Sequence, residues 1–295
     1  MIAISLIGEQ PIPNLLPLLY LRPYMAILVY SDRTEKVTRR LQRLLGRHDI
    51  KTHTLCTDAY DIQKIQANLQ EFLTSQRLEK AELIFNLTGG TKTMVIAAYK
   101  LARKYKAPFF YLQSEGKSSI LYRYCFNEEE IRYERKTLRS LLTIDDYLGA
   151  YLDDPYPQWT GPKDHFEQAI GEALKEAMDE VKVGVTLAPA LEVDLVVRVN
   201  NQVGVIQAKT GGAALRKDGL NQLNAACEQR YLGTYTYKIL VINQRWDDTR
   251  TNLLELAEAW RIKVIEVPSF TDATPWLSIE DQEYLRKQVK QVLSG

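Results

Sequence analysis

Four polar residues with alternating spacing form the strongest chemical pattern in the chain. Glu192 and Asp194 lie two residues apart, as do Gln207 and Lys209, and the dipeptide Asn200-Asn201 separates the two pairs. Such a dipeptide favours a tight hairpin turn, which would set Asp194 opposite Gln207 and Glu192 opposite Lys209. Alternate residues of a strand share one face, so the four side chains converge. This set is suited to holding a metal ion that assists phosphodiester cleavage.

The apolar residues around this set argue against an ordinary solvated strand face. The polar face continues as Val196 opposite Val205, and the other face carries Leu191, Val193, Leu195, Val197 and Ile206. Strands that are apolar on both faces are typical of a buried sheet. Charges at the end of a buried hairpin need a partner or a metal ion. The sequence therefore predicts a metal site there.

Each residue type has a place in that chemistry. Cleavage needs an activated water and neutralised negative charge, and a hard cation such as Mg²⁺ or Mn²⁺, held by oxygen ligands, supplies both. Asp194 would bind the ion directly, the Gln207 amide oxygen would be a weaker ligand, and the Ala208 carbonyl could help. Lys209 would orient or deprotonate the water, or stabilise the phosphate. Glu192 either pairs with Lys209 or reaches a second metal ion.

Size and composition set the wider frame. At 295 residues the chain suits two domains, and 45% hydrophobic with 25% charged residues is ordinary for globular proteins. A net charge of +1 gives no global attraction to nucleic acid, so binding would need a local patch. Three scattered cysteines favour a reducing compartment. We find neither a signal-peptide pattern nor a membrane-length apolar run, and expect a cytoplasmic protein without membrane contact.

The first half alternates strand and helix patterns. This alternation predicts a parallel sheet with helices on both faces, a Rossmann-like domain that binds ligands at the carboxyl ends of its strands. The expected strands are Ile2–Ile7, Met25–Tyr30, Lys51–Leu55, Glu82–Leu87 and Pro108–Leu112, and a last antiparallel strand is expected at Ser119–Phe126.

The loop Thr88–Thr93 follows one of these strands and opens a helix. Its glycines let backbone approach a ligand, and the free amides of the helix start, together with Lys92, attract anions. Neither common nucleotide motif is present, because Thr91 precedes the lysine where the phosphate loop needs glycine, and only Gly8 follows the first strand. The loop is therefore suited to a phosphate-bearing ligand held by another route.

The stretch Asn86–Met94 resembles the signature of CRISPR-associated Rossmann-fold (CARF) sensor domains, and Leu6–Asn14 is similar to the same group. The resemblance implies a homodimer that binds cyclic oligoadenylate across its axis, in a branch that joins the sensor to a restriction-type nuclease and responds to cyclic tetra-adenylate. It implies that Thr91 and Lys92 contact the ligand backbone. Glu9, Gln10 and Asn14 would contact adenine or ribose. The full candidate set is Gly8, Glu9, Gln10, Asn14, Ser31, Gly90, Thr91, Lys92 and Gln113.

The second half is similar to the core of PD-(D/E)xK nucleases. A helix is expected at Lys163–Val181, then the hairpin, and then alternating helices and strands at 220–230, 238–243, 251–260, 263–267 and 279–293. The resemblance assigns Asp194 as metal ligand, Gln207 in place of the usual second acid, and Lys209 as the motif lysine. A helix glutamate often completes such sites. We assign Glu172 to this role and keep Glu167 as the alternative.

Together with the patterns of strands and helices, these resemblances imply a sensor domain over 1–135, a linker over 136–158 and a nuclease domain over 159–295. The expected activity is metal-dependent endonucleolytic cleavage of DNA, RNA or both in type III CRISPR defence, switched on by cyclic tetra-adenylate. One alternative is a regulator whose second domain binds nucleic acid without cutting it, and another is a sensor half that slowly cleaves its own ligand. The number of adenylates in the ring and the effect of Gln207 on activity stay open.

Overall fold

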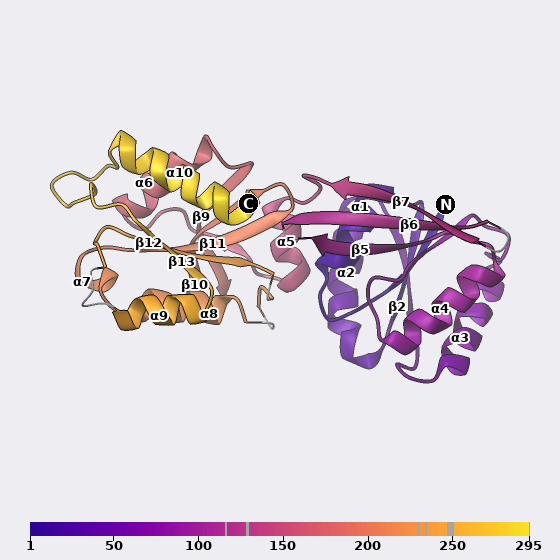
Figure 1. Ribbon diagram of the computed structural model, residues 1–295. Helices are drawn as coiled ribbons and strands as arrows, with labels where there is room; N and C mark the ends of the chain where they lie inside the picture. Colours follow the sequence, from indigo (N-terminus) through magenta and orange to yellow (C-terminus); the bar gives the residue numbers. More distant parts are fainter. Residues whose placement is uncertain (116, 128–129, 229–230, 234, 247–250, 295) are drawn as a thin grey trace. The chain divides into compact units, whose positions relative to one another are not determined.

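The computed structural model describes residues 1–115, 117–127, 130–228, 231–233, 235–246 and 251–294, with Thr251 described by its backbone alone. The chain divides into two compact units, Met1–Leu141 and Leu142–Gly295, and each has its own sheet (Figure 1). The predicted mixed α/β architecture with two sheets is confirmed. Across the described ranges, we find no helix that combines the length and apolarity needed to cross a membrane.

The described residues of the first unit form a seven-stranded sheet in the order β3-β2-β1-β4-β5-β6-β7. Strands β1 to β5 pair in parallel, and β6 and β7 extend the sheet as antiparallel partners. The parallel strands all end at one edge, where the loops after β1, β2, β3 and β4 meet. The strand bounds are β1 Ile2–Leu6, β2 Met25–Tyr30, β3 Lys51–Cys56, β4 Leu83–Asn86, β5 Phe109–Glu115, β6 Ser118–Asn127 and β7 Glu130–Leu138.

Helices cover both faces of this sheet (Figure 1). Helix α3 has an apolar stripe of Ile65, Leu69 and Leu73, which packs with α4 against β1, β2 and β4. Such spacing of three or four residues keeps apolar side chains on one helix face, and burying that face stabilises the layer. Helices α1 and α2 pack together in the same unit. The helix bounds are α1 Ile12–Leu21, α2 Glu35–Arg47, α3 Ile62–Ser75 and α4 Lys92–Lys104.

Strand β7 forms where a connector was expected. Its charged sequence predicted a solvated connector, yet Glu130–Leu138 pairs along its length with β6, with Tyr133 opposite Tyr124. The predicted linker over 136–158 contains the end of this strand and all of helix α5 (Ile144–Tyr151), whose Tyr147 and Leu148 are buried. The functional division at that linker stays a prediction.

The described part of the second unit forms a six-stranded sheet in the order β13-β12-β11-β10-β9-β8. Strands β8 to β11 pair antiparallel, whereas β11, β12 and β13 run in parallel. The strand bounds are β8 Gln158–Trp159, β9 Glu180–Ala188, β10 Leu191–Val199, β11 Gln202–Lys209, β12 Tyr237–Ile242 and β13 Ile262–Glu266.

Helices lie on both faces of this second sheet. Helices α6 and α10 pack on one face over a core that includes Phe166, Leu195 and Ile206, and α8 contacts β10, β11 and β12 (Figure 1). The expected helix from Lys163 to Val181 ends at Lys175, because Val181, Val183 and Val185 belong to β9. The end of the expected helix at 229–230 lies outside the described residues. The helix bounds are α6 His165–Lys175, α7 Gly211–Ala214, α8 Asp218–Ala226, α9 Thr251–Ala259 and α10 Ile279–Ser294.

The site hairpin has the predicted register over part of its length. Leu195 pairs with Ile206 and Val196 with Val205, as a turn at Asn200-Asn201 requires. Asn200 adopts a φ of 54°, the left-handed conformation that asparagine tolerates in turns. The ladder ends at Leu195–Ile206, so the predicted pairs Asp194–Gln207 and Glu192–Lys209 do not form.

Candidate functional site

The backbone pairing of β10 with β11 ends at Leu195–Ile206, and the Asp194 side chain contacts β11 in its place. Its Oδ2 accepts a hydrogen bond of 2.7 Å from the Ala208 backbone amide on β11, and Lys209 Nζ lies 3.7 Å from the same oxygen. The residue is only 6% exposed. Burial raises the pKa of Asp194, and the Lys209 ammonium and the Ala208 amide oppose that rise. The carboxylate is therefore held in the interior by one cation and one amide.

Gln207 lies on β11 two residues before Lys209, and strand alternation places both side chains on one face. Gln207 is 3% exposed, and its Oε1 has no hydrogen-bond donor among the described residues. Leaving a buried acceptor unsatisfied costs about 1–3 kcal/mol. A carboxylate and an unpaired amide oxygen on adjacent strands are the oxygen donors that a hard divalent cation requires.

The acid content of this cluster is low for a metal site. No group of three or more histidine, cysteine, aspartate or glutamate side chains in the described ranges is arranged to hold a metal ion. A cation here would therefore depend on Gln207 and on backbone oxygen beside Asp194. The residues present fit such an ion as a weak set of ligands.

Helix α6 brings Glu167, and not Glu172, to this cluster. Glu167 is 5% exposed, and its Oε2 accepts a hydrogen bond of 2.9 Å from the Lys163 amide. Burial raises the pKa of Glu167 to about 7; the Lys163 amide opposes this shift, and the negative charge of Asp194 adds to it. Glu172 is exposed and accepts from Gln168 Nε2 at 2.9 Å. Glu167 is the helix glutamate that can act together with Asp194.

Glu192 has a partner that the sequence did not indicate. Its Oε2 forms an ion pair with Lys163 Nζ, and Thr160 Oγ1 lies 3.5 Å from its Oε1. This pairing raises the pKa of Lys163. Neither role expected for Glu192, a pair with Lys209 or a second metal ligand, includes this contact. The available signal was the position of Lys163 directly before Asp164, the residue that caps the helix of Glu167.

The loop before α6, which carries Lys163, packs closely against β9. Thr160 donates from its backbone amide to the Gly184 carbonyl at 2.9 Å and from its hydroxyl at 3.2 Å. A Cβ atom on Gly184 would lie 1.9 Å from the Gly161 carbonyl oxygen, and Gly184 has a φ of +66°. Only glycine allows this approach without strain. The contact fixes the start of α6 relative to the strands.

In the first unit, the loop Thr88–Lys92 is fixed at both ends. The Thr91 and Thr93 hydroxyls donate to the Ala59 carbonyl at 2.5 and 2.6 Å, and Thr88 Oγ1 accepts from the Leu112 amide at 2.9 Å. Thr91 also caps α4 by accepting from the Met94 amide. The loop is therefore bound to the segments after β3 and within β5, and the amides at the start of α4 are held in place.

Asn14 lies beneath this loop in the interior. It is fully buried, and its Oδ1 accepts from Ser5 Oγ at 2.8 Å and from Asn86 Nδ2 at 3.1 Å. A Cβ atom on Gly89 would lie 2.8 Å from Asn14 Nδ2 and 2.2 Å from the Leu6 carbonyl oxygen. The structure thus gives Asn14 a supporting position below the loop, whereas the family resemblance implied contact with a base or ribose.

The other predicted ligand residues do not all line one cavity. Gly8, Glu9, Ser31, Gly90 and Thr91 line one cavity of about 190 Å³, together with Arg33 and Tyr60. Glu9 forms an ion pair with Arg33 at 2.5 Å. Lys92 and Gly90 line a second cavity, and Gln10 and Gln113 line neither of the two.

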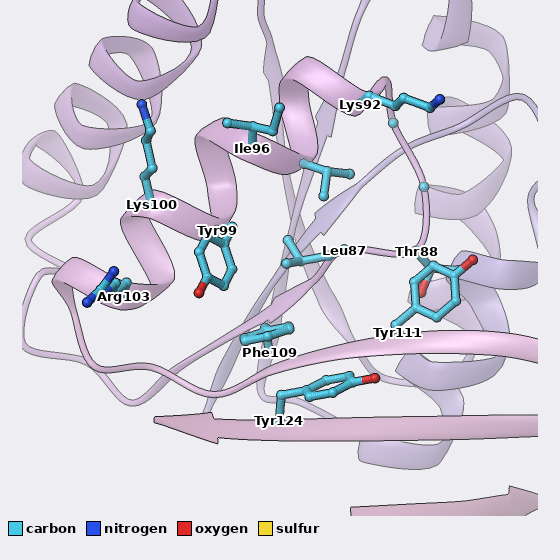
Figure 2. A pocket seen from close by; sticks show the side chains of 13 residues that line it. Leu87, Thr88, Lys92, Ile96, Tyr99, Lys100, Arg103, Phe109, Tyr111 and Tyr124 are labelled. Carbon is cyan, nitrogen blue, oxygen red and sulfur yellow. The ribbon is translucent and has the colours of Figure 1, made fainter. Parts of the chain in front are cut away.

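The second cavity, of about 870 Å³, lies between α4 and strands β5 and β6 (Figure 2). Phe109 and Tyr124 stack beneath the helix with ring centroids 4.8 Å apart, and Tyr99 meets Phe109 edge-on at 5.5 Å. The basic residues Lys92, Lys100 and Arg103 lie along α4. Ile96 and Tyr111, which also line it, are 45% and 41% exposed. The cavity combines an aromatic floor with positive charge.

Residues 2–147 match the family model for the Card1 CARF domain. No curated protein matches the chain. The solved structures that share its fold include the three that follow. Protein VC1899 from Vibrio cholerae is 16% identical with a TM-score of 0.74, over 98% of this chain and 97% of that one. Can2 from Sulfobacillus thermosulfidooxidans, solved in complex with cyclic tetra-adenylate, is 14% identical with a TM-score of 0.71, over 100% and 97%. A type III CRISPR defence DNA nuclease activated by cyclic oligoadenylate is 15% identical with a TM-score of 0.60, over 100% of this chain and 45% of that one.

Proposed function

We propose that this chain, whose residues 2–147 match the Card1 CARF domain, is a metal-dependent endonuclease of CRISPR defence that cyclic oligoadenylate activates. The family match supports cyclic-oligoadenylate sensing as the task of the first unit. The likeness to Can2, solved with cyclic tetra-adenylate, favours that ring size as the activator. The likeness to a CRISPR defence DNA nuclease agrees with a cleaving second unit.

One observation supports nuclease chemistry most directly. Asp194 is buried at the end of a hairpin and is held by Lys209. On the adjacent strand, the Gln207 amide oxygen has no donor among the residues that the structure describes. An acid and a lysine on paired strands, with a second oxygen donor between them in sequence, match the residue types of a PD-(D/E)xK site. We therefore assign the second unit to that class of nuclease.

The cation would be Mg²⁺ or Mn²⁺, held by Asp194, Gln207 and the Ala208 carbonyl. When bound, such an ion lowers the pKa of a water and neutralises phosphate charge. Lys209 donates hydrogen bonds to the attacking water or to the phosphate oxygens. Glu167, with its pKa of about 7, can accept a proton from that water near neutral pH.

Cyclic tetra-adenylate would bind at the loop Thr88–Lys92 in a homodimer. The loop presents the helix amides and the Lys92 charge to a phosphate. The larger cavity shares Thr88, Gly89, Gly90 and Lys92 with this loop, and its exposed Ile96 and Tyr111 offer apolar area to a second copy. A two-fold ligand on a two-fold dimer would be contacted by the same residues of both chains. Binding would activate the enzyme only by favouring the cleaving arrangement.

The test is cleavage of supercoiled DNA and of single-stranded RNA with Mn²⁺, in the presence of cyclic tetra-adenylate or cyclic hexa-adenylate. Wild-type protein is expected to cut when the ligand is present, whereas Asp194→Ala and Lys209→Ala are expected to be inactive. Glu172→Ala, which removes an exposed acid from α6, should retain activity. Absence of cleavage by the wild type, or full cleavage by the Asp194 variant, contradicts the proposal.

The replacement of an acid by Gln207 favours one second candidate, a ligand-controlled regulator that binds nucleic acid without cutting it. This alternative predicts ligand-dependent retention of DNA or RNA with intact strands. The same reactions, analysed for both retention and strand breakage, distinguish the two functions.

A further inference from the structure

A second lysine, in addition to Lys209, interacts with the carboxylates of the second unit. Lys163 stands in the loop before α6 and forms an ion pair with Glu192. Its charge also interacts with those of Glu167 and Asp194. Lys209, at the end of β11, pairs with Asp194. Lys163 and Lys209 therefore neutralise different carboxylates, those of Glu192 and Asp194.

The ion pair is not required to hold the loop. Strand β8 pairs with β9 directly before the loop, and Thr160 donates twice to the Gly184 carbonyl. Lys163 itself is 56% exposed and Glu192 is 26% exposed. An ion pair in such a setting contributes little to stability. Its main effect is on the charge that an approaching cation meets.

A second observation marks the place of that cation. The Gln207 amide oxygen is buried without a donor in the described residues, on the face that Lys209 shares. On β10, the Lys163 ammonium already pairs with Oε2 of Glu192. Asp194 and Glu192 therefore each have a lysine partner, and the buried Gln207 oxygen is left as an acceptor without a donor in the described residues.

We propose that Lys163 acts as a counter-cation for Glu192 and keeps that carboxylate from binding a metal ion. The site is then limited to one weakly held divalent ion at Asp194 and Gln207. This inference rests on the metal site of the proposed function. Like charges repel across the short distances of such a cluster, so the Lys163 ammonium lowers the affinity for the ion. The chain then carries two features that restrain metal binding: the amide at position 207 and the lysine at position 163.

The test measures Mn²⁺ binding to the full chain without nucleic acid, by the electron paramagnetic resonance signal of free Mn²⁺. Lys163→Met should bind Mn²⁺ about tenfold more tightly than wild type, because a positive charge near the ion is removed. Lys163→Arg keeps the charge and should bind as wild type does. Lys175→Met is the matched control, because it removes an exposed charge from the last turn of α6.

The sign of the change decides the outcome. If Lys163 only held the loop and Glu167 in position, its loss would weaken Mn²⁺ binding, and weaker or unchanged binding overturns the inference. Combining Lys163→Met with Glu192→Gln should return the affinity toward that of wild type. Wild-type binding that Asp194→Asn abolishes supports the proposed metal site whatever the Lys163 variants do. A wild type that binds no Mn²⁺ contradicts that metal site and this inference together.

Discussion

Glu167 gives the most direct test of how the site is built. A pKa of about 7 in the folded chain, against 4.5 for the free side chain, corresponds to about 3 kcal/mol of stability. Because the folded pKa is the higher one, folding is most favoured below pH 4.5, where both states are protonated. Stability is lost as the pH rises from 4.5 through 7 and is constant above that range. Glu167→Gln cannot ionise, so it escapes this loss.

We expect the variant to be more stable than wild type by at most about 3 kcal/mol at pH 8 and by less than about 1 kcal/mol at pH 5. The assay is urea unfolding without divalent cations, followed by tryptophan fluorescence. All four tryptophans of the sequence, Trp159, Trp246, Trp260 and Trp276, belong to the second unit, so the signal reports the unit that holds Glu167.

The control is Glu172→Gln, which removes the same charge from an exposed position of the same helix. Its stability should stay within about 0.5 kcal/mol of wild type at both pH values. The reasoning is refuted if Glu167→Gln is equal to or less stable than wild type at pH 8. That result would mean that the fold stabilises the ionised form of Glu167 and does not penalise it.

Three further changes test other parts of the structure. Gly184→Ala places a Cβ atom 1.9 Å from the Gly161 carbonyl oxygen and should lower the unfolding free energy by about 3 kcal/mol or more, whereas Gly212→Ala, with open space around it, should change it by less than about 1 kcal/mol in the same fluorescence assay. Arg198→Met leaves two acidic side chains without their shared guanidinium and should cost about 2 kcal/mol; a neutral result in urea unfolding would show that these ion pairs are fully screened. Lys92→Ala should weaken binding of cyclic tetra-adenylate by about tenfold in isothermal titration, and unchanged affinity would remove Lys92 from the ligand site.

The sequence predicted the hairpin best where local chemistry determines the geometry. Asn200 can adopt the left-handed conformation of a tight turn, which fixes the pairing of Leu195 with Ile206. The pairing could not be extended to Asp194, because its carboxylate takes the Ala208 amide. Only the folded chain shows that a side chain has replaced a strand partner.

Long-range contacts account for the other differences. The position of Asn14 after the first strand predicted a contact with the ligand. In the structure its hydrogen-bond partners are Ser5 and Asn86, which come from other segments of the chain. The edge strand β7 is exposed at eight of its nine residues, so it lacks the alternating apolar pattern that marks a strand. Lys163 has an ordinary position before a helix, and its partner Glu192 follows only after helix α6 and strand β9.

The tight packing of Gly89 limits which substitutions the loop Thr88–Lys92 can accept. With a Leu6 carbonyl oxygen 2.2 Å from where any side chain would begin, position 89 tolerates no other amino acid while the loop keeps its path. In a library that varies every residue of the loop, selection for function should leave this position unchanged. New ligand preferences would then have to arise at the nearby positions 88, 91 and 92, of which 88 and 91 are partly buried and 92 is exposed. Position 89 is therefore fixed by packing, whereas the side chains at 88, 91 and 92 can change.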